Sequence, residues 1–246
     1  MVNILISGYY GFDNIGDESI LRTLVSSLRE HIPECSLTVL SHNPASTREK
    51  YGVEAVDRMS PVAILHAVKK CDMLISGGGS LLQDVTSSKS LHYYLSIIRC
   101  AEFFHKKVFI YSQGIGPIDR PGNRRAAAAA LKRADGIVVR DERSASLLEE
   151  IGIARDKVVI TADPVIRMKK PDGDVGAEIL RKAGVSLDGR LTVGWAIRER
   201  DTDSRFVKEL LRSIQMMKDK YNAQSVLIPF HYEEDGEALS LIHISE

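Results

Sequence analysis

A glycine-rich segment near the N-terminus constrains the fold of this chain more than any other feature. Residues 8–18 read Gly-Tyr-Tyr-Gly-Phe-Asp-Asn-Ile-Gly-Asp-Glu, directly follow the apolar run at residues 2–6, and open into a helical pattern at residues 19–28. Glycines let the backbone turn tightly, and the first N–H groups of a helix lack intrahelical partners. We therefore expect a strand, a glycine-rich loop and a helix N-terminus, an arrangement that suits an anionic ligand.

The spacing leaves two interpretations of this loop open. Its glycines stand at positions 8, 11 and 16, which is not the Gly-x-Gly-x-x-Gly order of a dinucleotide fingerprint. Asp17 and Glu18 put negative charge at the start of the helix, where it stabilises the helix dipole but competes with a bound phosphate. Asp17 is therefore either a functional carboxylate or simply the N-cap of the helix.

The composition is that of a globular chain without a membrane-spanning segment. The chain has 246 residues, 44% of them hydrophobic, and no apolar run of the roughly 18 residues that a bilayer requires. Lys plus Arg and Asp plus Glu each total 33, so no overall positive field attracts nucleic acid. Cys35, Cys71 and Cys100 lack metal-ligand or redox-pair spacing, and the N-terminus lacks a signal-peptide pattern. We expect a soluble cytoplasmic protein without a metal, and peripheral association with the inner membrane surface stays open.

Short apolar runs alternate with amphipathic segments along the first two thirds of the chain. The predicted strands cover residues 2–6, 37–40, 73–75, 108–111, 137–139 and 158–160, and the predicted helices cover residues 19–28, 60–69, 90–105, 122–133 and 144–151. This alternation predicts the α/β class with a doubly wound parallel sheet, which is Rossmann-like. Ligands of such sheets bind beyond the carboxyl ends of the strands, so the glycines that follow these strands predict a functional rim.

A polar stretch after Asp163 and Pro164 predicts a domain boundary. The expected parts are an N-terminal Rossmann-like domain at residues 1–166, a linker at 167–174, a partial C-terminal Rossmann-like domain at 175–239 and a non-native tail at 240–246. The second domain offers one βαβ unit, with strands at 191–197 and 225–230 and a helix at 202–221. One unit is too little to bury the core of a doubly wound sheet, so we expect a C-terminally truncated chain.

Four ordered motifs are far more specific together than the first loop is alone. They are residues 8–18, Ser-Gly-Gly-Gly-Ser-Leu-Leu-Gln-Asp at 76–84, Ser-Gln-Gly-Ile-Gly-Pro at 112–117, and Arg-Asp-Glu-Arg-Ser at 140–144. Over residues 1–239 the chain resembles the polysaccharide pyruvyltransferase family, most closely its cell-surface-anchoring branch. The resemblance implies two Rossmann-like domains arranged as in GT-B glycosyltransferases. It also implies transfer of pyruvyl from phosphoenolpyruvate to a cell-wall saccharide, often lipid-linked, which gives a pyruvate ketal and releases phosphate.

That reaction requires a general acid, a general base and cations for carboxylate and phosphate. Arg140 is the expected cation, because its planar fork can hold an anion through two hydrogen bonds; an ion pair with Asp141 or Glu142 is the alternative. Asp17 is expected to act as base or to bind a sugar hydroxyl. The expected substrate contacts are Gly11, Asn14, Gly16, Gly78, Gly79, Gln83, Asp84, Gln113, Gly114, Arg198 and His231. For Gln83 with Asp84 a solvated loop pair stays open, and for Arg198 an ion pair with Glu199 or Asp201.

The chain also departs from the family pattern. Members continue well beyond this length and carry an Arg-Leu-His segment whose histidine is expected to be catalytic; that segment is absent here, and His231 does not match it. Two other hypotheses therefore stay open. One is a GT-B glycosyltransferase that uses a nucleotide sugar, and the other is a noncatalytic fragment that binds a saccharide or phosphate. No cofactor is expected under any of them.

Overall fold

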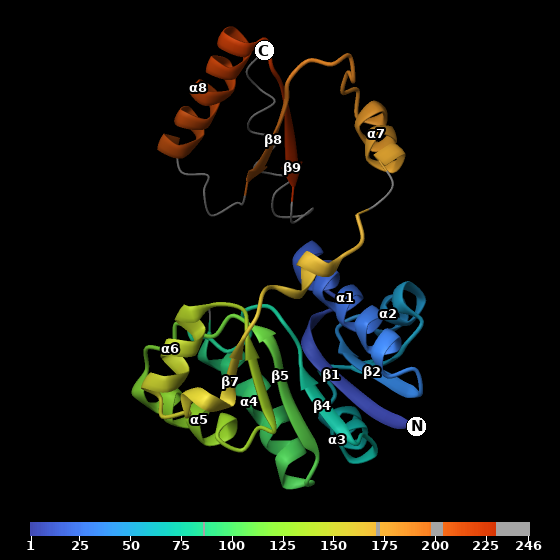
Figure 1. The fold of residues 1–246 in the computed structure, drawn as a ribbon, viewed down its shortest axis with the longest axis vertical. Coiled ribbons are helices and arrows are strands. Elements are labelled where there is room, and N and C mark those ends of the chain that lie inside the picture. The colour runs from blue at the N-terminus through green and yellow to red at the C-terminus, as the bar shows by residue number, and fades with distance from the viewer. Residues whose placement is uncertain (86, 171–172, 198–203, 230–246) are drawn as a thin grey trace. The chain divides into compact units, whose positions relative to one another are not determined.

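The computed structural model describes residues 1–246 except residues 86, 171–172, 198–203 and 230–246. The chain divides into two compact units, Met1–Met168 and Lys169–Glu246. Each unit has its own sheet, coloured blue to yellow in the first unit and orange to red in the second (Figure 1).

The first unit is built on a parallel seven-stranded sheet with the order β3-β2-β1-β4-β5-β6-β7. The strands are β1 (Val2–Tyr10), β2 (Cys35–Ser41), β3 (Glu54–Asp57), β4 (Met73–Ser76), β5 (Lys107–Gln113), β6 (Gly136–Val139) and β7 (Val158–Ile160). The α-helices are α1 (Ile15–His31), α2 (Pro44–Tyr51), α3 (Pro61–Lys70), α4 (Ser88–Phe103), α5 (Pro121–Leu131) and α6 (Glu142–Glu150), with short 3₁₀ helices η1 (Arg155–Lys157) and η2 (Pro164–Arg167). The predicted doubly wound, Rossmann-like sheet is confirmed. Its strand order reverses between β1 and β4, which is where such sheets bind ligands.

Both faces of this sheet are covered, and the strand residues alternate between two apolar clusters. Ile4 and Ile6 of β1 pack into the cluster that contains Leu24 of α1, whereas Leu5 packs into the cluster that contains Ile98 of α4. Alternation with a period of two residues is the geometry of a strand. Burial on both faces is the reason why these strands read as apolar runs in the sequence.

One helix and one strand of the first unit were not predicted from the sequence, and neither were its 3₁₀ helices η1 and η2. Helix α2 begins after Asn43, whose side-chain oxygen accepts a hydrogen bond from the Ser46 N–H, but its sequence Pro-Ala-Ser-Thr-Arg-Glu-Lys-Tyr carries almost no apolar stripe. Strand β3 has only four residues at the edge of the sheet. Neither α2 nor β3 offers the periodic apolar signal on which the prediction rests.

The second unit contains α7 (Gly173–Lys182), β8 (Thr192–Ile197), α8 (Ser204–Tyr221) and β9 (Gln224–Pro229). Strands β8 and β9 form a parallel pair around α8, as the βαβ pattern predicts. Helix α7 begins inside the span predicted as a linker, so residues 173–174 are helical. The predicted tail at residues 240–246 lies outside the described residues.

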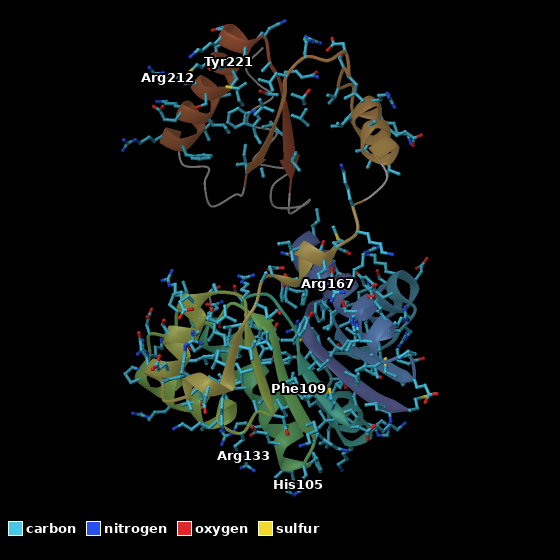
Figure 2. The ribbon with its side chains drawn as sticks, viewed as in Figure 1. His105, Phe109, Arg133, Arg167, Arg212 and Tyr221 are labelled. Carbon is cyan, nitrogen blue, oxygen red and sulfur yellow. The ribbon has the colours of Figure 1, made fainter. Side chains whose placement is uncertain are left out.

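All strands of the first sheet run in the same direction, so they begin along one edge, the amino-terminal edge, and end along the other, the carboxyl-terminal edge. The two edges carry different residues. Figure 2 shows His105 and Arg133 at the amino-terminal edge, with Phe109 on the sheet between the edges. The glycine-rich loops follow β1, β4 and β5 at the opposite, carboxyl-terminal edge. The site is therefore built at the carboxyl edge.

Candidate functional site

The loop after β1 places Asp17 at the switch point of the sheet. Asn14 is the N-cap of α1, because its side-chain oxygen accepts a hydrogen bond of 3.1 Å from the Asp17 N–H. The interpretation of Asp17 as the N-cap is therefore wrong. Its carboxylate instead faces the loop after β4, where a Cβ added to Gly79 would lie 2.9 Å from Asp17 Oδ1. Gly16 is exposed in the first turn of α1.

In the glycine loop, the Gly11 N–H that could bind an anion is already hydrogen-bonded to a carboxylate of the chain itself. The Gly11 N–H donates a hydrogen bond of 2.8 Å to Glu18 Oε1, and the Tyr51 hydroxyl donates to the other oxygen of Glu18. Burial, with the hydrogen bond to Glu18, raises the pKa of Tyr51, so the phenol keeps its proton. Because an internal carboxylate occupies the Gly11 N–H, we remove Gly11 from the substrate contacts. The glycine is needed for the close approach of the loop to Ser41 and Asn43.

The glycines after β4 and β5 let the chain approach two charged side chains. The Gly114 N–H donates a hydrogen bond of 2.9 Å to the Gly79 carbonyl, which joins the two loops. A Cβ on Gly114 would lie 2.8 Å from the Nε of Arg140, so the guanidinium rests against that backbone. Gly78 has a packing role as well, since a Cβ there would lie 2.9 Å from the Ile20 side chain. The Gly114–Gly79 hydrogen bond thus has Asp17 beside one end, at Gly79, and Arg140 beside the other, at Gly114.

Arg140 follows β6 and is held in place by partners from other strands. Its two Nη atoms donate hydrogen bonds of 2.9 Å to Asp163 Oδ2 and 2.9 Å to Ser80 Oγ, while Nε lies 3.8 Å from Asp141 Oδ2. The ion pair with Asp141, which was the expected alternative, is therefore only the longest of these three contacts of Arg140. Glu142 pairs with Arg155 instead. The Arg140 side chain remains 30% exposed, so it is not sealed from solvent.

Ser80 and Asp163 belong to this cluster but were not predicted from the sequence, and Asp163 also lies outside the four motifs. Asp163 follows β7, accepts a hydrogen bond from the Val165 N–H at the start of η2, and orients Arg140 with its second oxygen. The available signal was its position after a strand, at the same edge as the predicted rim. From the sequence alone, Asp163 marks only a predicted domain boundary.

Two of the predicted contacts are buried structural residues. Asp84 accepts hydrogen bonds from the Asp119 and Arg120 N–H groups and from Asn123 Nδ2, at 2.9, 3.1 and 2.8 Å. Gln113 is fully buried and donates through Nε2 to the carbonyl and hydroxyl of Ser76. We remove both from the proposed contacts, and half-buried Gln83 stays among them.

The Asp84 contacts predict a pH-dependent contribution to stability. Burial would raise the pKa of Asp84, but the three hydrogen bonds outweigh it and hold the pKa below its usual value. A depressed folded-state pKa means that the contribution is present above about pH 4, the pKa in the unfolded chain, and is lost as the pH falls through the folded-state pKa.

We therefore expect Asp84→Asn to destabilise the first unit by about 1.5–3 kcal/mol at pH 7, since an amide group replaces one acceptor oxygen. The loss is expected to shrink below about pH 4, where the carboxyl of the unfolded wild-type chain takes up a proton, and to shrink further as the pH falls through the folded-state pKa. Urea unfolding at several pH values measures this difference. A loss that is the same at pH 7 and at pH 3 would contradict the assignment.

The remaining predicted residues, Arg198 and His231, lie outside the described residues. Within the described part of the chain, no group of three His, Cys, Asp or Glu side chains is arranged to hold a metal ion. The described site therefore offers a cation (Arg140), a hydroxyl (Ser80) and a carboxylate (Asp17) at the switch point. Such a set can bind an anion and orient a sugar hydroxyl beside it.

Comparison with known proteins identifies a family and a fold. A family model described as "Polysaccharide pyruvyl transferase" matches residues 14–246. The amylovoran biosynthesis protein AmsJ of Erwinia amylovora is 22% identical over 239 residues, and the match covers 80% of this chain and 57% of that protein. The chain thus spans little more than half the length of this curated relative.

Solved structures share the fold at low sequence identity. Anabaena HepE in complex with UDP-glucose superposes with a TM-score of 0.62 at 11% identity, covering 99% of this chain and 65% of HepE. A UDP-N-acetylglucosamine 2-epimerase from Methanocaldococcus jannaschii gives a TM-score of 0.61 at 13% identity, covering 100% and 70%. Across the described residues, no helix combines the length and the apolar character that crossing a membrane requires.

Proposed function

Because this chain belongs to the polysaccharide pyruvyl transferase family, we propose that it contributes to transfer of a pyruvyl group from phosphoenolpyruvate to a cell-wall saccharide. The observation that carries this proposal is the guanidinium of Arg140, which Asp163 and Ser80 hold at the switch-point rim. A planar cation in that position suits the carboxylate or phosphate of the donor. The family description itself names a polysaccharide as the acceptor.

The chemistry assigns a different task to each group. Protonation of C3 of phosphoenolpyruvate makes C2 electrophilic, and a sugar hydroxyl then forms a C–O bond to C2 and loses its proton to a base. A second sugar hydroxyl attacks C2 as the C2–O bond to phosphate breaks, and its proton goes to the departing phosphate. This step closes the ketal and releases phosphate. Arg140 binds the donor anion, and Asp17 accepts a sugar hydroxyl proton or hydrogen bond. The proton donor to C3 is not among the groups that we assign.

Several finer parts of this function are proposals that rest on the family. They include the lipid-linked form of the acceptor, residues 175–239 as part of a second Rossmann-like domain, and peripheral association with the cytoplasmic face of the membrane. Arg198 and His231 remain proposed substrate contacts. Asn14, Gly16, Gly78, Gly79 and Gly114 remain proposed as the backbone and polar wall around the substrates.

Phosphate release from phosphoenolpyruvate tests the function, with a lipid-linked aminosugar disaccharide as acceptor. We would compare the 246-residue chain with a version extended, from the source DNA, to the length of its relatives. We expect acceptor-dependent release from the extended version. Absence of release from both versions, with UDP-glucose raising the melting temperature of either, would favour a nucleotide-sugar glycosyltransferase instead. Turnover by the 246-residue chain would exclude the noncatalytic hypothesis.

A further inference from the structure

An apolar groove lies beside the carboxyl edge, between α3 and α4. Its volume is ≈ 430 Å³, within the roughly 300–1,000 Å³ of small-molecule sites. The walls are mainly apolar, with Ile64 and Leu65 from α3 and Ile97 and Cys100 from α4; Arg58 and Tyr93 also line the groove. An apolar groove that contains one cation is suited to an amphiphile with an anionic group.

Arg58 is a buried cation with no carboxylate partner among the described residues. Arg58 is 6% exposed. No Asp or Glu in the described part of the chain lies within ion-pair distance of it. One Nη donates to the Gly8 carbonyl at 2.9 Å and the other to the Tyr94 hydroxyl at 3.2 Å, while the buried Nε has no hydrogen-bond partner among the described residues. A buried charge is costly unless it is paired. An anion reaching the guanidinium would supply the missing pair.

Aromatic rings hold this guanidinium where the groove meets the rim. The Arg58 carbon Cζ lies 4.7 Å from the centre of the Tyr93 ring on α4 and 5.1 Å from that of Phe12 in the loop after β1. Phe12 is stacked in turn between Tyr9 and His42, with ring centres 4.1 and 4.3 Å apart. Arg58 therefore contacts both the groove and the loop that carries the candidate site. A ligand held at Arg58 can extend from the groove toward that loop.

The surface around the groove has the charge and apolarity that such a ligand requires. Helix α3 contains no acidic residue, and Met59, which lines the groove, is 67% exposed. The neighbouring Asp57 carboxylate accepts a hydrogen bond of 2.8 Å from the Met59 N–H in its own turn. Apolar side chains next to the Arg58 cation favour a hydrocarbon chain with a negative head.

We propose that this groove binds a lipid phosphate, with the hydrocarbon chain between α3 and α4 and the phosphate at Arg58. This inference deepens the proposed function and rests on it for the cargo, because a saccharide attached to the phosphate would lie at the rim. Binding of the lipid phosphate requires neither phosphoenolpyruvate nor turnover. Its failure can therefore be distinguished from failure of the pyruvyl transfer.

Equilibrium dialysis of the 246-residue chain with farnesyl phosphate, below its micelle concentration, tests the groove. We expect Leu65→Glu to weaken binding by about tenfold or more, because it places a carboxylate in the apolar wall. Val62→Glu is the matched control, since it adds the same charge to the same helix at a residue that does not line the groove. We expect that variant to bind within about twofold of wild type.

Three probes separate the parts of the ligand. Farnesol is expected to bind more weakly than farnesyl phosphate, and inorganic phosphate is not expected to compete. Arg58→Met is expected to reduce the preference for farnesyl phosphate over farnesol; if a melting curve shows that this variant is unfolded, the Leu65 and Val62 pair still decides. Equal binding by Leu65→Glu and Val62→Glu, or competition by inorganic phosphate at the concentration of farnesyl phosphate, would overturn the proposal.

Discussion

Replacement of Arg140 by lysine is expected to lower kcat/KM for phosphoenolpyruvate by about 10²–10³, the range seen when a preorganised donor to a reacting anion is removed. Arg140 contacts Asp163 and Ser80 at the same time through its two Nη atoms, and its side chain rests on Gly114. A lysine ammonium is a single point charge and cannot hold both partners in the geometry of the planar fork. Asp163 would then also lack its present ion-pair partner.

Two measurements check this expectation. Phosphate release is measured with whichever length of the chain turns over, and protection by phosphoenolpyruvate against thermal unfolding is measured with the 246-residue chain. Arg155→Lys is the matched control, because Arg155 pairs with Glu142 at the exposed start of α6, close in sequence to Arg140. We expect it to retain activity within about twofold. A similar loss in both variants would show that Arg140 has no special relation to the donor.

The sequence predicted the architecture because the central strands are buried on both faces. The apolar runs in β1, β4 and β5 stand out, and their alternation with amphipathic helices specifies a parallel sheet. Helix α2 was not predicted because it carries almost no apolar stripe. Its start is instead defined by the N-cap at Asn43. The rim position of Arg140 followed from topology alone.

The partners of the site residues were harder to predict, because they depend on which strands become neighbours. Asp163 reaches Arg140 only because β7 pairs with β6. Asn14 and Asp17 are both good N-cap residues, and the choice between them depends on where α1 begins. Asp84 and Gln113 were predicted as ligand contacts because they lie in the glycine-containing motifs, but a loop of this kind also needs buried side chains to satisfy its own backbone.

The glycine loop itself provides the largest expected effect on stability. We expect Gly11→Ala to lower the free energy of unfolding by about 2–5 kcal/mol, which combines the cost of a left-handed residue with that of overpacking. Gly11 has a φ of +81°, and an added Cβ would overlap Ser41 Oγ and lie 2.6 Å from the Asn43 backbone nitrogen. Relief requires the loop to move away from the turn after β2, which would also break the hydrogen bond from Gly11 to Glu18.

Urea unfolding followed by far-UV circular dichroism measures the loss, with Gly122→Ala as the matched control. Gly122 lies in the first turn of α5, and an added Cβ there meets nothing within 4 Å. That substitution is expected to raise stability by about 0.4–1 kcal/mol, because alanine restricts the unfolded chain. If Gly11→Ala were as stable as wild type, the loop would have to follow another path after β1. The placement of Asp17 opposite Gly79 would then lose its basis, and with it the proposed base.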